Sequence, residues 1–298
     1  MQIKCIQTST VRPAESWLIT SAQGLEYLIQ IGFPRDWLNP QSKPKEPSVP
    51  IMYLTDGNSV FSSSLERLHQ HLVLSEFGTS AGVIVAIGYL LPADSNFLWS
   101  ARRDWDLTPP SPGCLPTEGG ADDFAKFIQG RVKPLVRQRI KDIRGVDPGA
   151  QCLYGHSHGG LFTLHTMFTR PWMFDSYIAA SPSISWNNQF ILEEEASFRS
   201  ERVECDSPPS LMLYVGGAEQ NPRRKRDETD DEYEKRREQY QRRKDVDFVL
   251  EMNTRLRDSS KMKYLTSKVY DGEDHGTVIA CSISQGLATF FDGWPYID

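Results

Sequence analysis

The sequence predicts an α/β fold with a mostly parallel, doubly wound sheet and helices on both faces. Short apolar runs alternate with amphipathic helical patterns along the chain, which is typical of this class. Most runs are nearly continuous in apolar residues, as strands covered on both faces are. One run leads through a glycine-rich turn at residues 155–160 directly into a helical pattern.

The predicted elements follow in chain order. Apolar residues recur at period two in residues 25–33, the pattern of a half-buried antiparallel strand. Buried strands are then expected at 51–54, 83–87, 152–154, 177–180, 211–215 and 263–270. Helical patterns separate these strands at 63–73, 121–140, 160–168, 231–257 and 282–291.

The composition indicates a soluble globular protein. The chain has 298 residues, 39% of them hydrophobic and 24% charged, which excludes disorder throughout. A formal net charge of -6 argues against a protein that coats nucleic acid or an anionic membrane surface. We therefore expect small-molecule partners, no nucleic acid and no membrane. We also expect residues 1–298 to form one domain.

The cysteines and the start of the chain predict a cytoplasmic protein. The cysteines are odd in number, far apart and never spaced as CxxC, so they indicate reduced thiols rather than disulfides or a zinc site. The first residues lack the apolar core of a signal peptide, and no stretch approaches 18 uninterrupted apolar residues. The five cysteines are Cys5, Cys114, Cys152, Cys205 and Cys281.

Residues 92–120 form a long loop rich in proline and glycine. Long loops inside compact domains are usually functional or disordered. This loop leaves the carboxyl end of the strand at 83–87, on the side where α/β sheets bind ligands. Its middle carries four large side chains: Trp99, Arg102, Arg103 and Trp105.

Residues 223–244 mix both signs of charge. Asp231 and Lys235, like Glu238 and Arg242, stand at the i,i+4 spacing of a helix. The pattern favours a solvated helix face, with a docking surface as the alternative.

The strongest chemical pattern is GHSHGG at residues 155–160, which contains GxSxG around Ser157. Small residues permit a sharp turn between a strand and a helix, so that the serine is exposed at the top of the sheet. This context favours a nucleophilic serine in an α/β-hydrolase fold. The alternative is an ordinary glycine-rich helix start, or one that binds an anion.

A serine nucleophile needs a general base within hydrogen-bond reach. In the α/β-hydrolase fold the order along the chain is nucleophile, acid, histidine. His275 is the histidine well after the turn, in a loop between the last predicted strand and helix. His69, His71 and His165 are expected to be packing or surface residues.

His156 and His158 flank the serine, and their spacing also permits a metal site. No cluster of aspartate or cysteine in the nearby sequence supports that alternative. We expect neither a metal nor another cofactor.

Glu219 is the predicted acid of the triad. It follows the strand at 211–215, the usual place for a carboxylate that orients the histidine and stabilises its charged form. Other carboxylates lie on the charged segment, beside His275 or at the start of a strand, and are weaker candidates: Asp227, Asp230, Asp271, Asp274 and Asp175.

Acyl transfer also needs donors for the oxyanion of the tetrahedral intermediate. The backbone N–H of His158, directly after the nucleophile, is one predicted donor. The second is expected from Gly57 or Asn58, after the strand at 51–54. An ordinary tight turn is the alternative interpretation of the Asp-Gly-Asn sequence there.

Taken together, these segments resemble the putative-esterase family of α/β hydrolases, which includes the enterobactin and bacillibactin esterases and the fungal fusarinine-type siderophore esterases. The resemblance runs from about residue 19 to the end, through YLTDGNSVF, AIGY, RRDWDLTP, GGADDFAKFI, LYGHSHGGLF, AASPSISWNN and DGEDHGTV. It implies hydrolysis of siderophore esters, with Ser157 and His275 in the catalytic positions.

The resemblance also implies that Arg102 or Arg103 and Trp186 border the substrate pocket. Trp99 and Trp105 are further candidates for its lining, because a bulky, oxygen-rich ligand needs aromatic walls and fixed cations. An imported ferric siderophore is the expected substrate. A general carboxylesterase or thioesterase of the same fold is the main alternative, and a binding module without activity is another.

Overall fold

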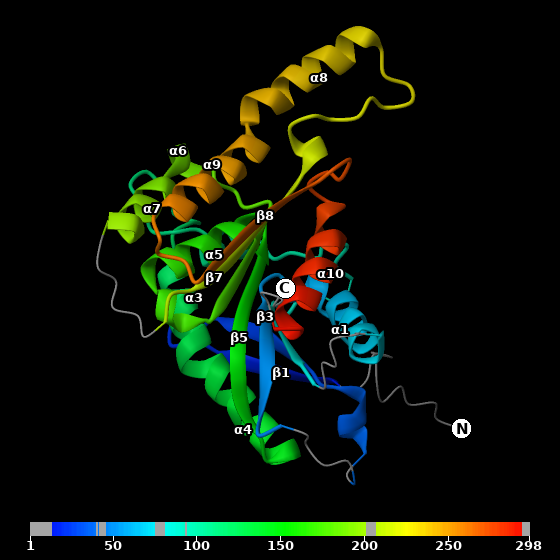
Figure 1. The fold of residues 1–298 in the computed structure, drawn as a ribbon, viewed down its shortest axis with the longest axis vertical. Coiled ribbons are helices and arrows are strands. Elements are labelled where there is room, and N and C mark those ends of the chain that lie inside the picture. Colours follow the sequence, from blue (N-terminus) through cyan, green and yellow to red (C-terminus); the bar gives the residue numbers. More distant parts are fainter. Residues whose placement is uncertain are drawn as a thin grey trace.

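One sheet organises the described part of the chain (Figure 1), which comprises residues 14–39, 41, 46–74, 81–92, 94–200 and 207–293 of the computed structural model. Its strand order is β1-β2-β4-β3-β5-β6-β7-β8. The strands are β1 (Ala14–Thr20), β2 (Glu26–Gly32), β3 (Ser48–Leu54), β4 (Val83–Gly88), β5 (Asp147–His156), β6 (Ser176–Ala180), β7 (Ser210–Gly216) and β8 (Tyr264–Tyr270). From β4 to β8 all neighbours are parallel, whereas β2 is antiparallel to both β1 and β4.

Helices cover both faces of this sheet. They are α1 (Gly57–Leu74), α2 (Arg103–Leu107), α3 (Ala121–Phe127), α4 (Lys133–Arg144), α5 (His158–Thr169), α6 (Trp186–Gln189), α7 (Ile191–Ser200), α8 (Asp230–Arg243), α9 (Asp245–Asp258) and α10 (Val278–Phe291). One apolar cluster joins α1 and α10 to one face, and a larger cluster joins α3, α4, α5 and α9 to the other. The predicted fold class, a mostly parallel sheet with helices on both faces, is confirmed.

The strand order brings distant segments together. β5 lies next to β3 on one side and β6 on the other, with β7 and β8 following. Because the carboxyl ends of parallel strands share one edge of a sheet, the segments that follow these five strands meet there. This edge therefore gathers residues 55–58, 157–158, 181–185, 217–219 and 271–276.

Strand β1 was not predicted from the sequence. It lies at the edge of the sheet, and most of its side chains are partly or fully exposed. An edge strand with both faces partly solvated lacks the apolar alternation that reveals a half-buried strand.

Two predicted helices are interrupted. The helix expected at 121–140 consists of α3, one π-helical turn (Ile128–Val132) and α4. Pro134 lies in the first turn of α4, where its missing N–H does no harm. The helix expected at 231–257 breaks at Lys244, whose φ of 56° is left-handed. Neither glycine nor proline marks that break in the sequence.

Helix α7 was also missed. Its buried side chains are Ile191, Glu195 and Phe198. Because the central one is a carboxylate, the apolar helical pattern is interrupted. Arg255 of α9 neutralises Glu195 through two hydrogen bonds of 2.8 Å, so the charge is buried with a partner.

The described cysteines Cys114, Cys152 and Cys281 are free thiols. Cys5 and Cys205 lie outside the described residues. None of the helices described here combines the length and the apolar character that a membrane crossing requires.

Candidate active site

Ser157 occupies a strained turn between β5 and α5. Its φ of 60° and ψ of −119° are unfavourable for a residue with a Cβ atom. The flanking glycines make the turn possible. A Cβ atom on Gly155 would lie 2.0 Å from the carbonyl oxygen of Gly159, and one on Gly159 would lie 2.3 Å from Thr55 Oγ1. The chain thus has the tight strand-to-helix turn that GxSxG predicts.

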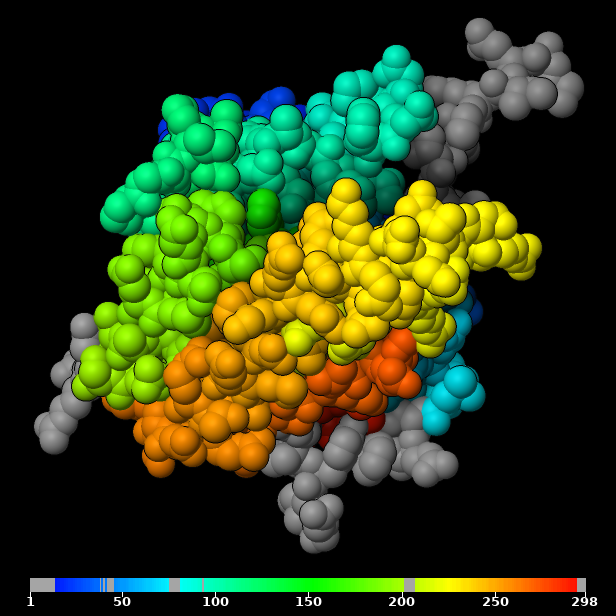
Figure 2. All heavy atoms as spheres, turned by 90° about the horizontal axis from the view of Figure 1, so that it is seen from above, coloured from blue at the N-terminus to red at the C-terminus, as the bar shows by residue number. Residues whose placement is uncertain are grey.

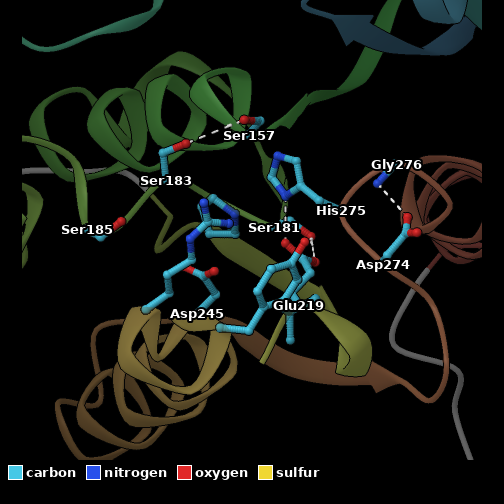
Figure 3. Close-up of a pocket in the computed structure, with 13 residues that line it drawn as sticks. Ser157, Ser181, Ser183, Ser185, Glu219, Asp245, Asp274, His275 and Gly276 are labelled. Carbon is cyan, nitrogen blue, oxygen red and sulfur yellow. Dashed lines mark hydrogen bonds and ion pairs between the residues drawn. The ribbon is translucent and has the colours of Figure 1, made fainter. Parts of the chain in front are cut away.

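His275 and Glu219 are hydrogen-bonded beside this turn. His275 Nδ1 lies 2.6 Å from Glu219 Oε2, so that Nδ1–H donates to the carboxylate. Figure 3 shows the imidazole between Ser157 and Glu219, with one edge turned toward each. The structure therefore brings together the three residues that the sequence nominated as nucleophile, base and acid.

The second carboxylate oxygen of Glu219 is also hydrogen-bonded. Oε1 accepts hydrogen bonds from Ser181 Oγ at 2.5 Å and from the backbone N–H of Gly216 at 2.8 Å. Burial alone would raise the pKa of Glu219, but hydrogen bonds from His275, Ser181 and Gly216 outweigh it and lower the pKa below its ordinary value. Glu219 is therefore a carboxylate, able to stabilise a positively charged His275.

A cavity of about 440 Å³ opens at Ser157 and His275. Besides these two residues and Glu219, it is lined by the serine-rich segment after β6, by the last turn of α8 and by the start of α9. Ser157 Oγ lies 3.5 Å from Ser183 Oγ, within reach of a weak hydrogen bond. The remaining named lining residues are Ser181, Pro182, Ser185, Val215, Tyr240, Arg243, Asp245, Asp274 and Gly276.

The predicted oxyanion donors lie at two helix starts that neighbouring strands bring together. His158 is the first residue of α5, and Gly57 and Asn58 are the first two of α1. Backbone N–H groups in a first helical turn have no acceptor within their own helix. The Asn58 side chain exchanges hydrogen bonds of 2.8 Å with both backbone groups of Tyr89, which ties this turn to the end of β4.

An ion pair fixes the loop before Gly57. Arg103 Nε donates to Asp56 Oδ1 at 2.6 Å, and Nη2 donates to Oδ2 at 2.9 Å and to the carbonyl of His156 at 3.2 Å. Burial alone would lower the pKa of Arg103, but the Asp56 carboxylate outweighs this and raises it. Arg103 thus joins the segment after β3 to the end of β5.

The histidines beside the serine have protein partners. His158 Nδ1 lies 3.0 Å from Asp104 Oδ1. The ring of His156 lies 4.5 Å, centroid to centroid, from that of His275. Burial, reinforced by the neighbouring His275, lowers the pKa of His156 to about 3, so this ring stays neutral. Among the described residues, no cluster of three or more metal-ligating side chains was found.

The predicted lining residues from the long loop lie elsewhere. Arg102 and Trp105 line a second cavity with Tyr27. The Arg102 guanidinium stacks over the Tyr27 ring at 4.4 Å, donates to the carbonyl of Glu26 at 2.5 Å and pairs with Asp106 at 3.3 Å. The structure therefore places Arg102 and Trp105 outside the cavity that holds Ser157.

The other two predicted tryptophans differ in environment. Trp99 is 45% exposed. Trp186 begins α6, directly after Ser185 of the cavity, and its Nε1 donates to Glu118 at 3.2 Å. Neither is among the residues that line the cavity at Ser157.

The remaining histidines, which were expected to be packing or surface residues, are buried. His69 Nε2 contacts the carbonyl of Phe33 at 3.0 Å, and His71 pairs with Asp292 at 2.8 Å. His165 is buried between Asp122 and Glu194.

Sequence reasoning missed the residues of two cavity walls. Ser181, Ser183 and Ser185 follow β6, and the rule that ligands bind at carboxyl ends of strands could have found them. Tyr240 and Arg243 belong to the charged segment at 223–244, which was interpreted as a solvated helix face. Their position depends on how α8 packs, which no local pattern encodes.

A strained serine turn at the carboxyl edge of a parallel sheet, followed along the chain by an acid and a histidine, is the arrangement of α/β hydrolases. Among these proteins, the chain belongs to the family described as "Putative esterase", whose sequence pattern matches residues 21–266. The family resemblance predicted from the sequence is thus confirmed.

Similar proteins cover nearly the whole chain. It is 40% identical over 285 residues to a siderophore triacetylfusarinine C esterase of Aspergillus fumigatus, and this match covers 95% of this chain and 94% of that protein. It is 38% identical over 297 residues to a siderophore enterobactin esterase of Emericella nidulans, with 95% of each chain covered. The structure of siderophore hydrolase EstB from Aspergillus nidulans superposes with a TM-score of 0.90, at 38% identity and 98% coverage of both chains.

Proposed function

We propose that this protein is a serine esterase that hydrolyses carboxylic ester bonds of siderophores, acting on the imported ferric complex. The observation that carries the proposal is the Ser157–His275–Glu219 arrangement at an open cavity. Similarity over nearly the whole chain to proteins named as siderophore esterases supports the substrate class.

In the proposed mechanism, His275 Nε2 takes the proton of Ser157 Oγ as this oxygen attacks the ester carbonyl carbon. Glu219 accepts the Nδ1–H hydrogen bond and stabilises the imidazolium that forms. The N–H of His158, with that of Gly57 or Asn58, donates to the oxyanion. Collapse of the tetrahedral intermediate releases the alcohol, which receives the proton from His275, and leaves an acyl group on Ser157.

Water completes the cycle. His275 removes a proton from water, the hydroxide attacks the acyl carbon, and the second tetrahedral intermediate collapses to the carboxylic acid. The proton on His275 returns to Ser157 Oγ. The reaction consumes one ester bond and one water molecule and needs no cofactor.

We also propose that the reaction takes place in the cytoplasm. The free thiols of Cys114, Cys152 and Cys281 support this assignment, because reduced cysteines are typical of that compartment.

The test is turnover of the purified protein with a panel of esters. The panel comprises linear and cyclic hydroxamate esters, catecholate trilactones with and without iron, and short p-nitrophenyl esters. A kcat/KM for one siderophore ester well above that for the p-nitrophenyl esters would support the proposal. Turnover of the p-nitrophenyl esters alone would overturn the siderophore substrate and leave a general carboxylesterase.

A further inference from the structure

Helix α8 has little contact with the core of the protein. None of its residues is buried, and it extends away from the sheet (Figure 1). Its stability rests on local interactions instead. Thr229 and Glu232 form a capping box at its start, and surface ion pairs follow along it. Exposure to solvent is enough to explain the charges on such a helix. Its last turn, however, does not simply face solvent.

The last turn of α8 borders the catalytic cavity. Tyr240 and Arg243 line it together with Ser157 and His275. Seen from above, the yellow and amber residues of the 223–244 segment cover much of this face of the molecule (Figure 2). A helix that contributes nothing to the core thus supplies one wall of the site.

This wall is held at a defined position. Arg236 and Arg243 both stack on the Tyr240 ring, 5.7 and 5.3 Å from its centroid. Glu228 fixes Arg236 through two hydrogen bonds of 2.7 Å. The Tyr240 ring therefore contacts two guanidinium groups, one of which is anchored.

The wall is also connected to the loop of the proposed acid. Immediately after α8, the chain turns at Lys244 and begins α9. The Gln220 side chain accepts hydrogen bonds of 3.1 Å from the N–H groups of Val246 and Asp247 in the first turn of α9. Gln220 is the residue directly after Glu219, so the position of the wall is set relative to the catalytic groups.

Arg243 is available to a ligand in a way that Arg102, Arg103 and Arg242 are not. Arg103 is paired with Asp56, Arg102 with Asp106, and Arg242 with Glu238. Within the described part of the chain, no carboxylate forms an ion pair with Arg243. Asp245 lies near enough to interact electrostatically with Arg243, but the two side chains form no ion pair.

On the basis of the esterase function above, we propose that Arg243 and Tyr240 recognise the substrate by binding an oxygen-rich group distant from the scissile ester bond. A guanidinium binds paired oxygen atoms through its planar fork, and an aromatic ring packs against a planar group. Iron-chelating hydroxamates and catecholates share this chemistry, since both present two adjacent oxygen atoms. The short p-nitrophenyl esters carry only a nitro group, which does not chelate iron and accepts hydrogen bonds far more weakly than the oxygens of these chelators.

The test compares Arg243→Ala with Arg242→Ala, which removes an equal charge from the adjacent position. Initial rates are measured on a hydroxamate ester, a catecholate trilactone and p-nitrophenyl butyrate. For Arg243→Ala we expect kcat/KM on at least one siderophore ester to fall at least about tenfold more than on p-nitrophenyl butyrate. The loss should lie mainly in KM. Arg242→Ala should match the wild type on all three.

Further variants separate recognition from structural damage. Arg243→Lys keeps the charge but not the fork, and should recover part of the loss. Tyr240→Leu should show the same selective loss as Arg243→Ala. The hydroxamate and catecholate arms identify which chelating group the wall binds.

Three outcomes overturn the inference. If Arg243→Ala behaves like Arg242→Ala on every siderophore ester, recognition lies elsewhere and the proposed function stands. If Arg243→Ala loses activity equally on all esters, its role is structural. If the wild type hydrolyses p-nitrophenyl butyrate alone, the siderophore substrate and this inference fail together.

Discussion

Arg103 holds both carboxylate oxygens of Asp56 and, with the same guanidinium, the carbonyl of His156. The first partner precedes one proposed oxyanion donor, Gly57, and the second precedes the nucleophile, Ser157. The cation thus links the two segments that carry the proposed oxyanion donors. Its Nε and Nη2 groups are used by the protein, and Arg103 is not among the residues that line the cavity at Ser157.

Arg103→Ala should therefore lower kcat for every ester, including the smallest, by about tenfold to a hundredfold, as misplacement of an oxyanion donor does. Leaving the buried Asp56 without its partner should also cost about 3 kcal/mol of folding free energy. Initial rates and chemical denaturation measure the two effects. Arg102→Ala is the matched control and should retain kcat on p-nitrophenyl esters. A loss with Arg103→Ala that is confined to siderophore esters would contradict the positioning role.

Ser157→Ala and His275→Ala should each reduce ester turnover by several orders of magnitude, because the members of a triad act as a unit. Glu219→Gln should cause a large but smaller loss. Unchanged thermal unfolding of the serine variant would show that the fold is intact. Asp274→Asn is the control for the acid, because Asp274 Oδ1 accepts hydrogen bonds from the backbone N–H groups of Gly276 and Thr277. An inactive Asp274→Asn beside a fully active Glu219→Gln would mean that the acid is misassigned.

His165 should make stability depend on pH. Burial alone would lower its pKa, but hydrogen bonds to Asp122 and Glu194 outweigh this and raise it. A raised pKa means that the protonated ring stabilises the folded state below the ordinary histidine value of about 6.5, and that this contribution is lost as pH rises through the folded-state pKa. His165→Gln should thus lower Tm more at about pH 6 than at about pH 9. An equal decrease in Tm at both pH values would refute a charged His165.

The pKa of Asp122 is lowered chiefly by its hydrogen bond to His165, and further by Arg170. The contribution of this carboxylate is present above its unfolded value of about 3.9 and is lost as pH falls below it. Together the two groups stabilise the contacts between α3, α5 and α7 most strongly between about pH 4 and about pH 6.5, and this stabilisation declines as pH rises further through the folded-state pKa of His165.

EDTA should leave the hydrolysis of an iron-free ester unchanged, because the proposed steps use only protein groups and water. His158 is engaged with Asp104, and His156 packs against His275. Rates measured before and after dialysis against the chelator test this. A loss of activity that zinc restores would instead support a metal at His156 and His158.

The parts of the fold that sequence predicted are those with strong local patterns. The buried parallel strands are continuous apolar runs, and GxSxG fixes a turn through its own glycines. These patterns also gave Ser157, His275 and Glu219, because the chain order of a triad follows from the strand order. In contrast, β1 and α7 were missed because an exposed edge and the buried Glu195 remove the apolar period.

The substrate side of the cavity was harder to predict for a different reason. Arg102 and Arg103 are cations in a loop at the correct edge of the sheet, but the sequence does not reveal that they form ion pairs with Asp106 and Asp56. Arg243 lies 24 residues beyond Glu219 in a segment whose charges match any solvated helix. Its position at the cavity depends on the left-handed turn at Lys244 and on Gln220, both of which are set by tertiary structure.

Because α8 has no buried side chains, its sequence is constrained by what it contacts at the cavity rather than by packing in the core. Substitutions of exposed α8 residues outside its capping box and ion pairs, proline and glycine excepted, remove no core packing, so they are expected to change the free energy of unfolding by no more than about 0.5 kcal/mol. Substitutions in the segments after β3, β5, β7 and β8 disturb both folding and chemistry. The wall formed by α8 can therefore vary in sequence without disturbing the core or the proposed catalytic groups.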